Sequence, residues 1–251
     1  MPPELLTSRK NEIVVHMRKL CSDKEYRRQS KEFVCEGEKL LSEALIEKAE
    51  ITRVLWNEKV LSDIPHLPEQ YTVKEELAAY ISPLKNSGGP IFSVRMKDRH
   101  LPREAKRAIV LDGVGDPGNV GTVIRTADAM GVDAVILLDR CADPYNPKTV
   151  RATMGAIFRQ YIRTEQQMHG LAGFLHSHGL KLYGASNTKN AVDIRETDLK
   201  KAAIAIGNEG GGLSRELMDL CDGLIVIPIA PECESLNAAV AAAVIMWEGF
   251  R

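Results

Sequence analysis

The chain has 251 residues, more than one domain usually contains, so two domains are favoured over the alternative of one large α/β domain. Apolar residues make up 44% and charged residues 27%, and no apolar run is long enough to span a bilayer. With a net charge of −1, these values argue against a membrane protein and against nucleic-acid binding through overall charge.

The amino terminus and the cysteines predict a reducing, cytoplasmic compartment. The first residues lack the basic flank, apolar stretch and cleavage site of a secretory signal. The cysteines are scattered, without CxxC spacing or a matching histidine pair, so we expect neither a disulfide framework nor a metal site. The five residues are Cys21, Cys35, Cys141, Cys221 and Cys233.

The first 31 residues carry a local positive charge. They contain eight basic and four acidic residues, which gives a net charge of +4. Such a segment is either a solvated helix face or a surface that binds phosphate, and composition leaves both open. The candidates for phosphate contacts are Arg9, Lys10, Arg18, Arg27 and Arg28.

Residues 33 to 94 predict a small α/β unit. Strands are expected at FVCEG, ITRVLWN and IFSVRM, and a helix at EKLLSEALIEKA, where apolar residues recur at helical spacing. Residues 86–90 form a loop, and the charged stretch 97–107, which contains Pro102, is typical of a linker. We therefore predict a substrate-binding domain over residues 1–100 and a second domain over 101–251.

The second domain has longer apolar strands. They are expected at 108–114, 133–138, 181–186, 202–207 and 223–229, and they are rich in Val, Ile and Leu with little alternation. This pattern is typical of strands covered on both faces, and the helical segments between them predict a mostly parallel, doubly wound sheet. Ligands bind such sheets beyond the carboxyl ends of the strands.

The loop after the first of these strands reads DGVGDPGNVG and leads into a helix that is expected to end near Gly131. Pro117 and Gly118 suit a tight turn, and Asn119 is expected to cap the helix. Arg125 lies between apolar neighbours, where it either points toward the strand ends or forms a surface salt bridge. The local sequence leaves both readings open.

The next unusual loop, GNEGGGLS over residues 207–214, allows close backbone approach to a ligand. It matches neither the P-loop nor the dinucleotide fingerprint. The alternative is a flexible turn with Ser214 as a helix cap, but Glu209 among the glycines favours a functional loop. A third loop, PIAPECESLN, places Ser235 and Asn237 at the start of the last helix, where an anion is favoured; ordinary capping is the alternative.

These three loops, in this order, resemble the signature motifs of the SpoU (TrmH) family of RNA 2'-O-ribose methyltransferases in the SPOUT superfamily. The resemblance covers residues 108–251 and includes DPYNPKTVRATMGAIFRQ. The amino-terminal part is more loosely similar to the ribosomal-protein-like RNA-binding domain of some members. The resemblance implies a trefoil-knotted α/β domain, an RNA substrate and a homodimer whose interface completes the site. Composition and cysteine spacing, as noted above, indicate no membrane span and no metal site.

The resemblance also implies S-adenosylmethionine as the cofactor and assigns roles to individual residues. The implied cofactor-binding residues are Gly207, Asn208, Gly210, Ile227, Ile229, Ser235 and Leu236. The implied catalytic residues are Arg125, Asn119, Glu209, Ser235 and Asn237. Arg151 joins the amino-terminal basic residues as an RNA-binding candidate.

Arg125 is the residue proposed in this family to activate the ribose 2'-hydroxyl. A guanidinium normally stays protonated, so the alternative is that Arg125 positions the hydroxyl or a neighbouring phosphate. Pro231 departs from the family pattern, which often has glycine there, and it removes one N–H donor. A cofactor contact by that backbone position is therefore in doubt.

Ribosomal RNA is the favoured substrate and transfer RNA the alternative. Two other functions remain open: an RNA-binding or ribosome-assembly protein without turnover, and a nucleotide-dependent enzyme that uses the glycine-rich loop. The missing P-loop lysine argues against the second of these.

Overall fold

A computed structural model describes residues 3–57, 67, 69–84, 89–97, 101, 104–208 and 210–250. Its contacts divide the chain into two compact units, one of Met1–Asp98 with Asp143–Phe158 and the other of Arg99–Ala142 with Arg159–Arg251. Residues 143–158 thus group with the first unit. The predicted domain boundary after residue 100 stays a prediction, and part of the predicted linker and of the loop 86–90 lies outside the described residues.

The first unit is built on a mixed five-stranded sheet in the order β1-β4-β3-β5-β2. Strand β5 pairs antiparallel with β2 and β3, whereas β4 pairs parallel with β3 and β1. The strands are β1 (Glu4–Leu6), β2 (Glu32–Glu36), β3 (Ile51–Asn57), β4 (Gln70–Val73) and β5 (Ile91–Arg95). The helices are α1 (Glu12–Ser22), α2 (Lys24–Ser30), α3 (Glu38–Ile46), α4 (Glu75–Ile81), α6 (Pro147–Thr153) and the 3₁₀ turn η1 (Ala156–Phe158).

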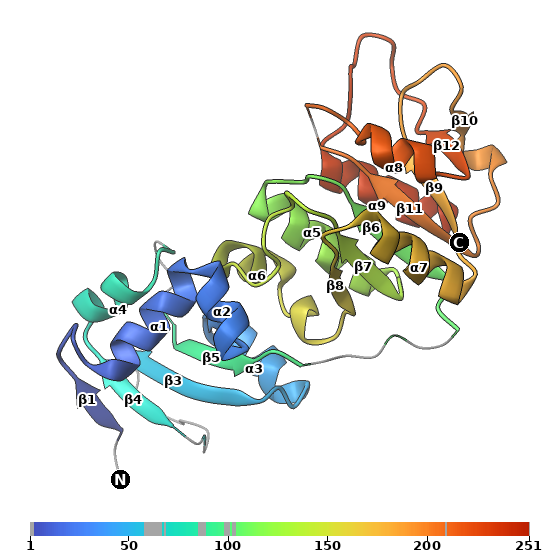
Figure 1. The fold of residues 1–251 in the computed structure, drawn as a ribbon. Coiled ribbons are helices and arrows are strands. Elements are labelled where there is room, and N and C mark those ends of the chain that lie inside the picture. The colour runs from blue at the N-terminus through green and yellow to red at the C-terminus, as the bar shows by residue number, and fades with distance from the viewer. Residues whose placement is uncertain are drawn as a thin grey trace. The chain divides into compact units, whose positions relative to one another are not determined.

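Helices α1 and α4 supply the core on one face of this sheet (Figure 1). Val14, Met17 and Leu20 recur at helical spacing on α1 and are fully buried, together with Leu77 and Ile81 of α4. The predicted strands and the helix over 38–49 are confirmed by β2, β3, β5 and α3. The sequence did not predict β1, β4 or α4.

The segment 143–158 packs against strand β2. The Phe33 ring lies 5.0 Å from that of Tyr145 and 6.3 Å from that of Phe158, measured between centroids. Arg27, only 3% exposed, donates to Asp143 over 2.6 and 3.0 Å and to the Leu20 carbonyl over 2.7 Å. An aromatic contact and a buried ion pair therefore attach this segment to the first unit.

The second unit holds a seven-stranded sheet in the order β10-β12-β9-β11-β6-β7-β8, with every neighbouring pair parallel. The strands are β6 (Arg107–Leu111), β7 (Ala134–Leu137), β8 (Ile162–Thr164), β9 (Lys181–Ala185), β10 (Val192–Asp193), β11 (Ala202–Ile206) and β12 (Gly223–Val226). The helices are α5 (Pro117–Ala129), α7 (Met168–His178), the 3₁₀ turn η2 (Ile194–Glu196), α8 (Arg215–Leu220) and α9 (Ala238–Gly249).

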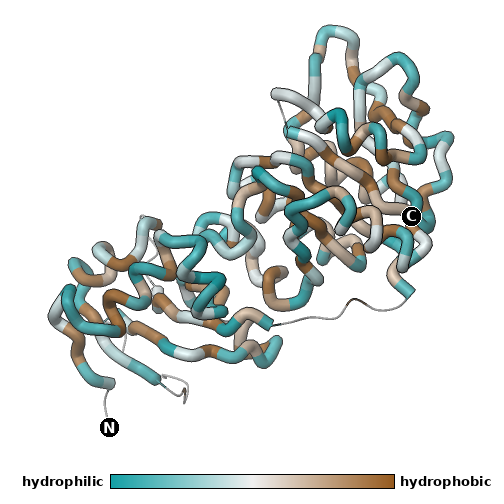
Figure 2. The backbone as a smooth tube through the Cα atoms, viewed as in Figure 1, coloured by the Kyte–Doolittle hydropathy of each residue, from teal (hydrophilic) through white to brown (hydrophobic). Residues whose placement is uncertain are grey.

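Helices cover both faces of this sheet. Leu171 and Phe174 of α7 and Leu217 of α8 pack on one face, against the alternate residues of β6, β7 and β11. Helices α5 and α9 contact each other, and α9 packs on β11 from the other face (Figure 1). In Figure 2 the hydrophobic stretches follow the strands. The predicted α/β class with a parallel, doubly wound sheet is confirmed, and the trefoil knot stays a prediction.

Helix α5 begins earlier than expected, so the predicted cap at Asn119 is wrong. Asp116 is the N-cap: its Oδ1 accepts the Asn119 N–H over 2.8 Å, and Pro117 occupies the first helical position, where its missing N–H costs nothing. The expected stop is confirmed, since Gly131 has φ +66° and follows the last turn. Ser214 caps α8, as the alternative interpretation of the glycine-rich loop had it.

Within the described residues, no helix is both long and apolar enough to cross a bilayer.

We predict that Asp143→Ala strongly destabilises the first unit, because it leaves the Arg27 guanidinium buried without a counter-charge. The free energy of unfolding should fall by about 3–5 kcal/mol in urea titrations. The double variant Arg27→Met/Asp143→Leu should recover most of this loss, since no uncompensated charge remains. Glu25→Ala breaks an exposed ion pair with Arg28 and should change stability little. An Asp143→Ala variant as stable as the parent would contradict this assignment.

Candidate functional site

A cavity of about 270 Å³ lies in the second unit, at the carboxyl ends of β9, β11 and β12. This is the edge at which parallel α/β sheets bind ligands. Its wall combines the apolar side chains of Ile206, Ile225 and Leu213 with polar groups of the loops that follow the strands. A planar or partly apolar ligand suits such a wall.

The glycine-rich loop after β11 closes on itself. Asn208 and Gly212 exchange two backbone hydrogen bonds, of 3.1 and 2.8 Å, and Gly212 has φ +65°. A Cβ on Gly207 would lie 2.1 Å from the Gly212 carbonyl carbon. Only glycine therefore fits at position 207, because another backbone segment occupies the space of a side chain.

Two side-chain contacts fix this loop to the loop after β6. The Asn208 side chain donates to the Gly113 carbonyl over 2.9 Å, and the Ser214 N–H donates to the Asp112 carboxylate over 2.6 Å. Two of the motif loops that lie far apart in the sequence thus form one wall at the edge of the sheet.

The loop after β12 forms the opposite wall of the cavity. Its Cys233 N–H donates to the Ala230 carbonyl over 2.9 Å, which makes a turn with Pro231 in its second position, where the fixed φ of proline is favourable. The Asn187 side chain donates to the Glu234 carbonyl over 2.7 Å and so ties this loop to the end of β9. Pro231 itself is exposed and does not line the cavity.

Asn237 connects the last helix to α5. Its Oδ1 accepts the Ala239 N–H over 3.0 Å as the N-cap of α9, and its Nδ2 donates to the Asn119 side chain over 3.1 Å. Both predicted asparagines therefore meet in one hydrogen bond, so Asn237 is a cap and an inter-helix contact together.

Arg125 is exposed on α5 and makes no hydrogen bond or ion pair within the part of the chain that the structure describes. The surface salt bridge, one of the two readings of its sequence context, is therefore absent there. Arg125 is also not among the residues that line the cavity.

The structure brings six of the seven candidate cofactor residues to one cavity; these are Gly207, Asn208, Ile227, Ile229, Ser235 and Leu236. Gly210 lies outside its lining and instead donates to the Asn208 side chain over 2.7 Å. Glu209 lies outside the described residues. Sequence reasoning missed Ser186 and Asn187, which line the cavity. The available signal was their position: Ser186 ends the predicted parallel strand 181–186 and Asn187 follows it, at the sheet edge of the motif loops.

The candidate RNA-binding residues belong to the first unit. Those that are exposed are Arg9, Lys10, Arg18, Arg28 and Arg151. The guanidinium carbons of Arg9 and Arg18 lie 4.6 and 4.0 Å from the centre of the Tyr80 ring, close enough for cation–π contact. Arg27 must be withdrawn from this set, because its guanidinium is buried and already bound to Asp143.

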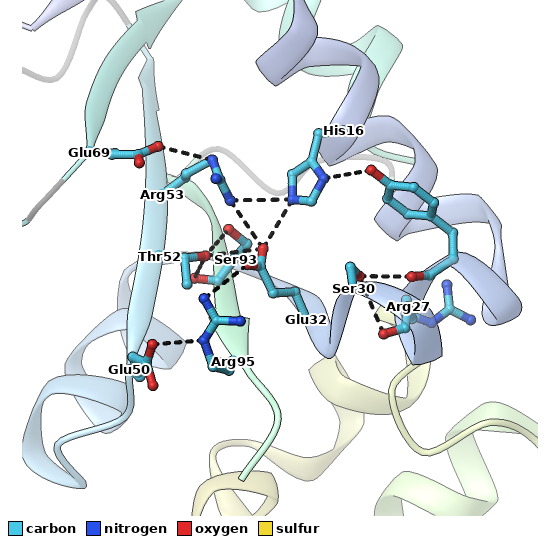
Figure 3. Close-up of polar contacts among 11 residues, drawn as sticks. His16, Arg27, Ser30, Glu32, Glu50, Thr52, Arg53, Glu69, Ser93 and Arg95 are labelled. Carbon is cyan, nitrogen blue, oxygen red and sulfur yellow. Dashed lines mark hydrogen bonds and ion pairs between the residues drawn. The ribbon is translucent and has the colours of Figure 1, made fainter.

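A polar cluster in the first unit surrounds the buried Glu32 carboxylate (Figure 3), and the sequence analysis did not predict it. Glu32 Oε2 lies 3.0 Å from His16 Nε2 and 3.2 Å from Arg53 Nη1, and Oε1 lies 3.6 Å from Arg95 Nη2. Burial acts to raise the pKa of Glu32, but the hydrogen bond with His16 and the charge of Arg53 together lower it below its ordinary value of 4.5.

Comparison with known proteins places these features in a family. The profile of the SpoU rRNA Methylase family matches residues 106–247. The chain is 32% identical to the 23S rRNA (guanosine(2553)-2'-O)-methyltransferase RlmP of Bacillus subtilis over 96% of this chain and 97% of that protein. It is 33% identical to the uncharacterized tRNA/rRNA methyltransferase slr1673 of Synechocystis over 98% and 93% of the two chains.

Solved structures resemble the whole chain. The SpoU methyltransferase AviRb from Streptomyces viridochromogenes, in complex with the cofactor AdoMet, superposes with a TM-score of 0.87 at 25% identity, over 96% of this chain and 97% of that one. The AdoMet-bound rRNA methyltransferase from Sinorhizobium meliloti gives a TM-score of 0.83 at 30% identity, over 98% and 97%.

We predict that Gly207→Ala distorts the glycine-rich loop, because the new methyl group would overlap the Gly212 backbone. The free energy of unfolding should fall by about 1–3 kcal/mol in a denaturant titration. Gly211→Ala is the matched control: no atom lies within 4 Å of its added Cβ, so stability should stay nearly unchanged. Equal stability of the two variants would contradict the close contact between Gly207 and the Gly212 backbone.

The Glu32 cluster predicts a pH dependence of stability. Because the folded state lowers the Glu32 pKa, its contribution is present above about pH 4.5 and is lost as the pH falls through the lowered value. Glu32→Gln should therefore cost about 1–3 kcal/mol of unfolding free energy at pH 7, and this difference should shrink in increasingly acid buffers. A difference that is constant from pH 7 to pH 2 would contradict the prediction. Glu50→Gln, at an exposed carboxylate, is the control.

Proposed function

The chain belongs to the SpoU rRNA Methylase family, and we propose that it transfers a methyl group from S-adenosylmethionine to a ribose 2'-hydroxyl of ribosomal RNA. The observation that carries the proposal is the cavity at the carboxyl ends of β9, β11 and β12. Two of the three motif loops line it directly, and the third is bonded to its wall through Gly113.

The residues of the cavity fit S-adenosylmethionine. Ile206, Ile227 and Ile229 offer apolar surface for an adenine ring, and Gly207 allows the glycine-rich loop to close against Gly212 at the wall. Ser235 and Leu236 would border the cofactor from the opposite loop. When bound, S-adenosylmethionine supplies the electrophilic methyl group.

The polar residues around the cavity would position the RNA. Arg125 carries an exposed guanidinium with no partner among the described residues, and we assign it to a phosphate or a ribose hydroxyl of the RNA. Because arginine normally stays protonated, its role is to orient the 2'-hydroxyl for attack rather than to remove its proton. The hydrogen bond between Asn119 and Asn237 would hold α5 and α9 in register at this edge.

A homodimer would complete the site, and α9 offers the surface for it. Val240, Val244 and Trp247 recur along one side of this helix and are exposed, with Trp247 62% accessible. A row of large apolar side chains on one helix marks an interaction surface. This stripe lies on the helix that Asn237 caps, so a second copy packed there would approach the catalytic edge.

RNA binding is assigned to the first unit, where Arg9, Lys10, Arg18 and Arg28 are exposed. A chain with a net charge of −1 must gain affinity for phosphate from such local groups. We assign ribosomal RNA because RlmP, which matches almost the full chain, is named for 23S rRNA. The cytoplasm, where RNA and cofactor occur together, is the proposed location.

The reaction is tested by methyl transfer from labelled S-adenosylmethionine to unmodified ribosomal and transfer RNA in parallel. We expect label in ribosomal RNA, with the modified ribose resistant to alkaline cleavage. Label confined to transfer RNA would overturn the substrate class. RNA binding without binding of the cofactor would instead identify a non-catalytic RNA-binding protein.

We predict that Arg125→Ala lowers the rate of methyl transfer by about 10²-fold or more while the cofactor is still bound, since Arg125 does not line the cavity. Arg125→Lys retains a charge but not the planar donor pair and should recover only part of the rate. Single-turnover rates and calorimetric titration of the cofactor measure the two effects. Full activity of Arg125→Ala would exclude the proposed role.

A further inference from the structure

A second cavity, of about 600 Å³, opens on the same edge of the parallel sheet, where β6, β7 and β8 end and α8 begins. The sequence motifs did not predict a ligand site at this cavity, although Asp112 and Ser214 in its wall belong to two of the motif loops. It is larger than the cavity of about 270 Å³ at the ends of β9, β11 and β12.

The two cavities share a wall. Leu213 lines the cofactor cavity, and the next residue, Ser214, lines the second cavity. Asp112 lines the second cavity and accepts the Ser214 N–H, while its neighbour Gly113 accepts from Asn208, which lines the first. A ligand in the second cavity would therefore lie one loop away from the bound cofactor.

The second cavity is lined by two arginines that have no partner among the described residues. Arg140 and Arg215 line it, are exposed, and make no hydrogen bond or ion pair within the described residues. Arg140 has φ +67°, a left-handed backbone that side-chain-bearing residues rarely adopt and that is concentrated at functional sites. Planar guanidinium groups without partners are suited to phosphate.

The cavity also presents hydrogen-bond acceptors, since the carboxylates of Asp112, Asp139, Glu165 and Glu216 line it beside the two arginines. Asp112 is 4% exposed, and its Oδ2 accepts the Ser214 N–H, but no hydrogen bond in the described part of the chain reaches Oδ1. Glu165, in contrast, is already bound to Arg163 over 2.6 Å. Asp112 is therefore available to an N–H or O–H donor.

We propose that the second cavity binds a nucleotide of the RNA that flanks the methylated one. A ribonucleotide combines the two chemistries found there: its phosphate would bind Arg140 and Arg215, and its base N–H or ribose hydroxyl would donate to Asp112. The proposal rests on the proposed RNA methyl transfer and adds to it a subsite for substrate recognition, separate from the cofactor cavity.

The test compares Arg140→Asn and Arg215→Gln with Lys181→Gln. Asparagine tolerates the left-handed backbone at position 140, so that variant removes the charge without adding strain. Lys181 is an exposed cation at the amino end of β9, the opposite edge of the sheet, and controls for loss of one positive charge. RNA affinity is measured over a series of salt concentrations, together with KM, kcat and affinity for the cofactor.

We expect each arginine variant to raise the Kd and KM for RNA about tenfold, with kcat at saturating RNA and affinity for the cofactor unchanged. The slope of log Kd against log salt should fall by about 0.7–1 per arginine, which a purely structural role would not change. If the arginine variants still methylate RNA with an unchanged KM and an unchanged salt dependence of the Kd, the proposed subsite is wrong and the proposed methyl transfer stands. An equal loss of RNA affinity in Lys181→Gln would also overturn the proposed subsite. Absence of methyl transfer by the parent protein would instead refute the proposed function.

Discussion

The functional edge of this protein depends on the close approach of the glycine-rich loop to itself at Gly207 and Gly212. Two backbone hydrogen bonds between Asn208 and Gly212 close the loop. The Asn208 side chain and the Asp112 carboxylate then bind it to the loop after β6. One side of the resulting wall faces the cavity proposed for S-adenosylmethionine, and the other faces the cavity lined by Arg140 and Arg215. A single backbone constraint thus shapes both proposed ligand sites.

The five long strands of the second unit could be predicted because parallel strands covered on both faces read as uninterrupted apolar runs. Strands β8 and β10 could not, since they are short edge strands without such a run. The cap of α5 was misplaced because Asp116 and Asn119 are both capping residues; Pro117, favoured at the first helical position, was the signal that decides between them.

Long-range partners limited the prediction of individual roles. Arg27 belongs to a basic segment, and nothing near it shows that it is buried, because its counter-ion Asp143 is 116 residues away in the chain. The Glu32 cluster was missed for the same reason, since its partners come from a helix and two further strands. Six of the seven candidate cofactor residues lie at one cavity, because they stand at or beyond the ends of β11 and β12, whose carboxyl ends meet at one edge of the parallel sheet. Their role in binding the cofactor stays a proposal.

The central claim is that the cavity formed by the loops after β9, β11 and β12 binds S-adenosylmethionine. The most direct measurement is a cofactor titration followed by methyl NMR of protein labelled at its isoleucine side chains. The account predicts that the signals of Ile206, Ile227 and Ile229 shift, whereas those of Ile81 and Ile91 in the first unit do not. Unchanged signals at the three cavity residues at saturating cofactor would contradict it.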